Sequence, residues 1–173
     1  MQKIHRPPHH LGNNGIYFIT ASTFLKKALF SNSEKKNMLT GVIKEKSSKF
    51  GVKIIAWVVM DSHYHLLVRI ENDKNLSGFV KGVNGKSAFL LNRIDNILKR
   101  EVWYNYWESC INNEKDFWMR FNYIHHNPIK HGLAEKMEGY SFSSYEDWLG
   151  KKGREWMEDV LENYPIVDFS GDK

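Results

Sequence analysis

The stretch WVVMDSHYHLLVRI, residues 57–70, decides the fold, because it reads as two strands joined by a tight turn. Residues 52–60 (VKIIAWVVM) predict a strongly apolar strand, Asp61 and Ser62 a turn, and residues 63–70 the returning strand. The two strands together predict an antiparallel hairpin. The second strand is unusual because His63 and His65 flank a single tyrosine within an otherwise apolar run.

The two faces of the strand at residues 63–70 differ, because side chains alternate across a strand. One face is apolar or aromatic and is expected to pack on helices: Tyr64, Leu66, Val68 and Ile70. The opposite face, expected to be open, carries His63, His65, Leu67 and Arg69. The rise of a strand places the two histidine Cα atoms about 6.6 Å apart, so both rings could converge on one cation. Two histidines are too few for a closed zinc site, so other ligands must come from elsewhere in the chain. The alternative to a metal site is two ordinary surface histidines.

The elements around the hairpin predict a mixed α+β sheet. Residues 16–20 predict a short strand and residues 103–108 a fourth one. Ser31 and Glu34 have the spacing of a capping box for a helix that runs to about Phe50 and ends at Gly51. Helical spacing of apolar residues predicts a further helix over 75–93, and short helices follow near 143–149 and 154–163.

The order of these elements is strand, helix, strand, strand, helix, strand, and then helices. This is the order of a ferredoxin-like (RRM-like) antiparallel sheet with a C-terminal helical addition. We expect one domain, with an irregular arm at 1–15, a core at 16–127 and a helical extension at 128–173.

A polar stripe is predicted on the helix that Asn113 caps and that runs from Glu114 to about His126. Tyr123 lies off the apolar stripe of this helix, and Asn127 lies one turn later on the same face. Pro128 predicts that the helix stops at Asn127. A tyrosine packed at the helix edge, with Asn127 as a C-cap, is the alternative interpretation.

Composition narrows the class of protein. The chain has 173 residues, a formal net charge of +5 and a pI of about 9.2, which favours a polyanionic partner. Cys110 is the only cysteine, so an internal disulfide is excluded and a reducing, cytoplasmic location is expected. No apolar run has the length of a membrane span, so no membrane partner is expected.

Two motifs resemble those of a known family. VMDSHYHLLV resembles the VMPNHVHLLV motif of single-tyrosine HUH transposases, and YIHHNPIKHGL (123–133) resembles the YIHLNPVRAGL motif of their REP-associated tyrosine transposase branch. YFIT, WESCI and YSFSSYEDWLG also match, and the order agrees from about residue 6 to 149. Asp61-Ser62 replaces the usual Pro-Asn, and Lys130-His131 replaces an Arg-Ala pair, but no catalytic group is lost.

The resemblance implies roles for particular residues. His63 and His65 correspond to the metal ligands, Asn127 completes the metal site, and Tyr123 corresponds to the nucleophile. The implied metal is Mg²⁺ or Mn²⁺, and the implied substrate is single-stranded DNA near a hairpin. The implied product is a 5′-phosphotyrosine. We expect the protein to act as a monomer or a homodimer. His125, His126 and His131 are further histidines to weigh as ligands, but they lack the strand geometry of the first pair.

Basic residues are candidates for DNA binding. They lie on the helix at 75–93, on the histidine face of the hairpin and in the N-terminal arm: Lys81, Lys86, Arg93, Arg69 and Arg6. They could contact backbone phosphates, and a solvated helix face is the alternative for each of those on the helix.

Two other functions fit parts of the pattern. A phosphodiesterase that activates water would use the same metal site without forming an adduct with the protein. A non-enzymatic binder on an RRM-like sheet would expose aromatic residues for base stacking, whereas residues 63–70 offer histidines and Arg69.

Overall fold

Four antiparallel strands form one sheet in the order β2-β3-β1-β4. Their bounds are β1 (Gly15–Thr23), β2 (Val52–Val59), β3 (His63–Ile70) and β4 (Trp103–Cys110). The computed structural model describes residues 15–169, so the predicted arm, including Arg6, lies outside the described residues except for Gly15, which begins β1.

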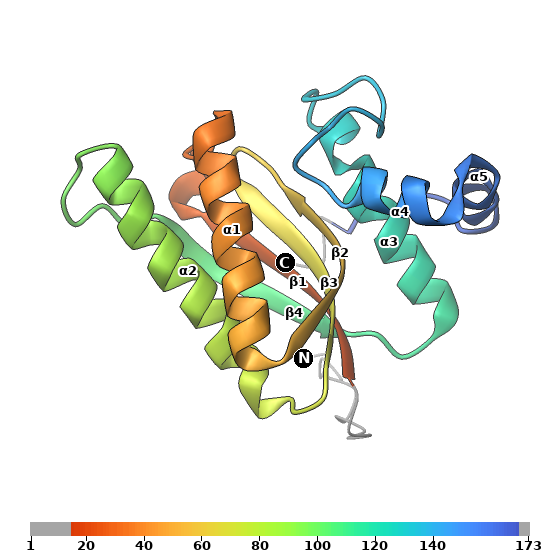
Figure 1. The fold of residues 1–173 in the computed structure, drawn as a ribbon, viewed down its shortest axis with the longest axis horizontal. Helices are drawn as coiled ribbons and strands as arrows, with labels where there is room; N and C mark the ends of the chain where they lie inside the picture. Colours follow the sequence, from red (N-terminus) through yellow and green to blue (C-terminus); the bar gives the residue numbers. More distant parts are fainter. Residues whose placement is uncertain (1–14, 170–173) are drawn as a thin grey trace, which may run out of the picture.

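Helices cover both faces of the sheet (Figure 1). One face carries α1 (Ser33–Phe50) and α2 (Lys74–Ile94). The other side carries α3 (Glu114–Lys130), α4 (Tyr145–Lys152) and α5 (Arg154–Asn163), and a short 3-10 turn, η1 (Phe24–Lys26), follows β1. The order of elements confirms the predicted ferredoxin-like α+β sheet with added C-terminal helices.

The hairpin at residues 57–70 is confirmed. β2 and β3 pair antiparallel from Val59 opposite Tyr64 to Val52 opposite Ile70, with a bulge between Ile54 and Ala56. The face predicted to be apolar belongs to the core cluster that includes residues of α1 and α2: Tyr64, Leu66, Val68 and Ile70. Burial of this face against the two helices fixes the register, because a slip of one residue would expose it.

The histidine face of the sheet is covered, so the expectation of an open face is wrong. α3 packs its own apolar residues, Phe121 and Ile124, into a second core cluster with Phe18 of β1 and Leu67 of β3. The apolar stripe of α3 needs a partner, and this face of the sheet supplies it. His65 is therefore only 2% exposed, which also excludes the alternative of two ordinary surface histidines.

Two predicted helix ends are wrong. Asn32, rather than Ser31, caps α1, and its side chain accepts a hydrogen bond from the Lys35 amide at 2.9 Å. α3 continues through Pro128 to Lys130, past the core boundary predicted at residue 127. Proline removes one helical hydrogen bond, but the buried Pro128 ring and later bonds, including His131 N–H to the Asn127 carbonyl, hold the last turn.

Two other predicted helix ends agree with the structure, whereas α4 begins and ends slightly later than predicted. Gly51 ends α1 with a φ of 64°, a conformation that favours glycine. Asn113 caps α3 and accepts from the Asp116 amide at 2.8 Å. Within residues 15–169, no helix is both long enough and apolar enough to span a bilayer.

Candidate active site

The candidate site lies where β1, β3 and α3 meet. His63 Nε2 donates a hydrogen bond to Asn127 Oδ1 at 2.9 Å, and both side chains are buried. The two residues come from β3 and from the last turns of α3, so the bond joins the sheet to the helix. Ser62 Oγ lies 3.3 Å from the other ring nitrogen of His63. The His63 ring is therefore held from both sides.

His65 is oriented by a neighbouring strand. Thr20 of β1 is its direct cross-strand partner, and Thr20 Oγ1 lies 2.7 Å from His65 Nδ1. The Phe18 ring stacks on the imidazole at 5.4 Å between centroids. When Nδ1 carries the proton and donates a hydrogen bond to Thr20 Oγ1, Nε2 keeps the lone pair that a cation needs. The two histidine rings lie 4.9 Å apart, so the strand brings them together as predicted.

Tyr123 lies against the same cluster. Its ring centroid is 5.3 Å from that of His65, and Asn127 follows it by one helical turn. The tyrosine is only 4% exposed. Phe169, in the segment after α5, packs edge-on against the Tyr123 ring at 5.3 Å. The phenol is thus near the histidines, but the C-terminal segment limits its access to solvent.

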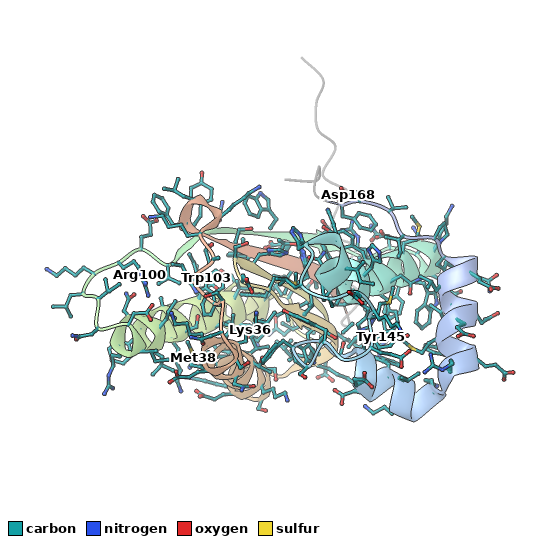
Figure 2. All side chains as sticks on the ribbon, turned by 90° about the horizontal axis from the view of Figure 1, so that it is seen from above. Lys36, Met38, Arg100, Trp103, Tyr145 and Asp168 are labelled. Carbon is teal, nitrogen blue, oxygen red and sulfur yellow. The ribbon has the colours of Figure 1, made fainter. Side chains whose placement is uncertain are left out.

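Lys130 places a positive charge beside Tyr123. Its ammonium lies 5.3 Å from the Tyr123 ring centroid and donates to Asp168 at 2.6 Å. Asp168 is labelled in Figure 2, in the segment after α5. Burial lowers the pKa of Lys130, but the hydrogen bond to Asp168 and the proximity of Tyr123 and Asp168 outweigh it and leave that pKa raised. Lys130 therefore stays cationic at neutral pH.

His63, His65 and Asn127 carry donor atoms of the kind that bind a divalent cation. In the tautomer of His63 that carries its proton on Nδ1, Nε2 has a free lone pair. Nε2 and Asn127 Oδ1 are 2.9 Å apart, close to the roughly 3 Å that separates adjacent ligands of an octahedral ion. Asn127 Nδ2 is buried without a hydrogen-bond partner in the described part of the chain, so the contact of this amide with His63 is made by Oδ1. Among residues 15–169, no group of three His, Cys, Asp or Glu side chains could hold a metal, so a metal at the two histidines would need a different third donor, such as the Asn127 amide.

The three additional histidines differ in their surroundings. His125 is 1% exposed, bonds Ser144 Oγ through Nε2 at 2.8 Å, and has its pKa lowered to about 3 by burial. It is a structural residue that links α3 to the segment beside β2. Burial also lowers the pKa of His126. His131 lies nearest to the candidate site, with its ring 4.9 Å from that of His63.

The four candidate DNA-binding residues that the structure describes do not gather at the site. Lys81, Lys86 and Arg93 lie on α2, in the helix layer on the other face of the sheet. Lys86 pairs with Glu45, and the Arg93 guanidinium lies over the Phe89 ring at 5.7 Å. Arg69 is exposed on β3, six residues from His63 and therefore about 20 Å along the strand.

Sequence reasoning missed several side chains around the site. Thr20, Phe18, Ser62 and Phe169 contact the histidines or the tyrosine. The register of β1 against β3 would have revealed Thr20, because direct cross-strand partners share a face. No sequence signal places Phe169, since its contact joins residues far apart in the chain.

The sheet and this buried cluster define the class of the chain: it belongs to the IS200-like transposases, whose family model matches residues 14–127. The REP-associated tyrosine transposase of Escherichia coli (strain K12) is 23% identical over 160 residues, covering 91% of this chain and 86% of that protein. A solved structure of a REP-associated tyrosine transposase bound to a REP hairpin has a TM-score of 0.71 and 23% identity, covering 90% of this chain and 89% of that one. The resemblance found in the sequence is confirmed, and the chain is a transposase.

Proposed function

We propose that this transposase is a metal-dependent single-stranded DNA endonuclease and strand transferase, with Tyr123 as its nucleophile. One observation carries the proposal: a tyrosine, two histidines and an amide lie together in one buried cluster. The Tyr123 ring is 5.3 Å from His65, and Asn127 bonds His63 at 2.9 Å. Burying several polar side chains between a sheet and a helix costs stability, so such a cluster indicates a functional site.

The reaction is a transfer between two phosphate esters. The Tyr123 phenol oxygen attacks the phosphorus of a DNA phosphodiester, and the bond from phosphorus to the 3′-oxygen breaks. The leaving oxygen takes up a proton as a 3′-hydroxyl, and the phenol proton is lost to solvent. The product is a 5′-phosphotyrosine, which keeps an ester bond, so a second 3′-hydroxyl can reverse the step and join strands without ATP.

The residues of the chain prepare this attack in different ways. A bound Mg²⁺ or Mn²⁺, held by His63, His65 and Asn127, would offset charge on the phosphate oxygens. Thr20 and Phe18 fix the orientation of His65. The Lys130 ammonium beside the Tyr123 ring places a positive charge where the phosphate would meet the phenol. Two imidazoles and an amide suit Mn²⁺ better than Mg²⁺ on grounds of ligand softness.

We propose that the substrate is a DNA strand that carries a hairpin repeat. The net charge of +5 suits a polyanion, and the similar solved structure holds a REP hairpin. A hairpin beside a single strand would give a folded feature to bind and a flexible strand to cleave.

The test uses end-labelled oligonucleotides that carry the palindromic repeats flanking the gene. With Mn²⁺, the purified protein should form a protein–DNA adduct that survives denaturation. Tyr123→Phe should abolish the adduct, whereas Tyr104→Phe, at a tyrosine that is 65% exposed, should not. Cleavage without any adduct would instead indicate a water nucleophile, and an adduct that persists in Tyr123→Phe would assign the nucleophile elsewhere.

A further inference from the structure

A cavity of about 550 Å³ lies along the edge strand β2, away from the candidate active site. Residues of α1, β2, β3, α3 and α4 line it, so it wraps around the edge of the sheet. A volume of this size is in the range of ligand pockets. Neither the histidine pair nor Tyr123 lines this cavity, so the proposed chemistry does not account for it.

The lining of the cavity is strongly basic. Four cationic side chains line it, against a single carboxylate, that of Asp147: Lys44, Lys53, Arg69 and Lys151. All four cationic residues are exposed. Lys53 and Arg69 are direct cross-strand partners on β2 and β3, so two like charges lie side by side. Such an arrangement is unfavourable without a counter-charge, and an anion in the cavity would supply one.

Aromatic rings accompany these charges. Trp57 and Trp148 both line the cavity, and the Lys44 ammonium lies 5.8 Å from the Trp57 ring centroid. Cationic side chains interleaved with aromatic rings are the pattern that binds single-stranded nucleic acid, because bases stack on rings while phosphates meet lysine and arginine. A duplex offers no exposed base faces and is too wide to enter a cavity of this volume.

The cavity and the active site share one helix. Phe117 of α3 lines the cavity, and Tyr123 follows six residues later, about 9 Å along the helix. On the sheet, Arg69 at the cavity lies six residues from His63 at the active site, which is about 20 Å along β3. A strand held at Tyr123 can therefore reach the cavity within a few nucleotides.

We propose that this β2-edge cavity binds a nucleotide of the single-stranded flank of the DNA substrate. The inference rests on the proposed function for the identity of the substrate. The cationic residues contact the backbone phosphates on either side of this nucleotide, and its base lies against Trp57. The cavity thus positions the strand whose phosphodiester meets Tyr123.

The test compares binding of two fluorescent hairpin oligonucleotides, one with a single-stranded flank and one without. All proteins carry Tyr123→Phe, so that no reaction occurs and the result does not depend on the nucleophile. The cavity variant is Lys44→Ala/Lys53→Ala/Lys151→Ala. The matched control, Lys27→Ala/Lys49→Ala/Lys74→Ala, removes the same charge from exposed lysines that do not line the cavity.

The cavity variant should bind the flanked hairpin at least tenfold more weakly and bind the bare hairpin as its parent does. The salt dependence of flank binding should fall by about 1.4 in log–log slope, since two phosphates flank the bound nucleotide and each single-strand phosphate contact contributes about 0.7. The control should change neither value. Equal weakening on both oligonucleotides, equal weakening in the control, or no weakening would overturn the proposal. The adduct assay on Tyr123 reports separately on the proposed function.

Discussion

Asn127 connects the sheet to α3 through one hydrogen bond and is also a proposed metal ligand. Removing its side chain should therefore affect both stability and metal binding. Asn127→Ala leaves a cavity in a fully buried position and removes the partner of His63. We expect unfolding in urea to show a loss of about 1–3 kcal/mol. Calorimetric titration should show weaker Mn²⁺ binding.

Asn163→Ala is the control for this change, because Asn163 is exposed and its side chain bonds Asp159 of its own helix, α5. It should stay within about 0.5 kcal/mol of the parent protein and bind Mn²⁺ normally. Unaltered Mn²⁺ affinity in Asn127→Ala would remove this amide from the metal site.

His125 makes stability depend on pH. Burial lowers its pKa from 6.5 to about 3, so the folded protein keeps it neutral while the unfolded chain takes up a proton below pH 6.5. The contribution of this residue is therefore fully present above pH 6.5 and is lost progressively as the pH falls toward 3. Between pH 7.5 and 5 the wild type should lose about 2 kcal/mol that His125→Gln does not lose. Urea unfolding at both pH values measures this, and an unchanged difference between the two proteins would contradict it.

Helix α1 allows a matched comparison of two glycines. Gly51 ends the helix at a φ of 64°, where a side chain is strained, whereas Gly41 lies within the helix with open space around its Cβ position. Gly51→Ala should destabilise the protein by about 1 kcal/mol. Gly41→Ala should stabilise it by a similar amount, about 0.8–1 kcal/mol. Thermal unfolding measures both, and changes of the same sign would refute the argument.

The sequence predicted the elements better than the contacts between them. Strand alternation placed His63 and His65 on one face, and helical spacing placed Tyr123 and Asn127 on another. Neither pattern shows that these two faces meet, because the periodicity of one element reports only its own burial. The histidine face was therefore expected to be open, and α3 covers it. The helix end predicted before Pro128 was wrong for the same reason, because tertiary packing outweighs one lost helical hydrogen bond.

At the scale of the whole molecule, the segment that follows α5 packs on the ring of Tyr123. Phe169 packs on the Tyr123 ring, and the Arg120 guanidinium lies over Phe169 at 4.1 Å. In the proposed reaction DNA has to approach this ring, so loss of the Phe169 contact should make Tyr123 easier to reach. Phe169→Ala should therefore form the covalent adduct several times faster in a time course.

Val167→Ala is the control for this truncation, since Val167 belongs to the same segment and is 38% exposed. It should leave the rate of adduct formation unchanged. Equal rates in Phe169→Ala and the wild type would show that the contact of Phe169 with Tyr123 does not slow adduct formation.

Mapping the covalent bond tests the central claim most directly. After reaction with a hairpin oligonucleotide and nuclease treatment, trypsin should release residues 121–130 as one peptide, since Arg120 and Lys130 flank it. Mass spectrometry should find a nucleotide remnant on this peptide and fragment it to Tyr123. A remnant on another peptide, or complete cleavage of the DNA with no remnant on any peptide, would contradict the account.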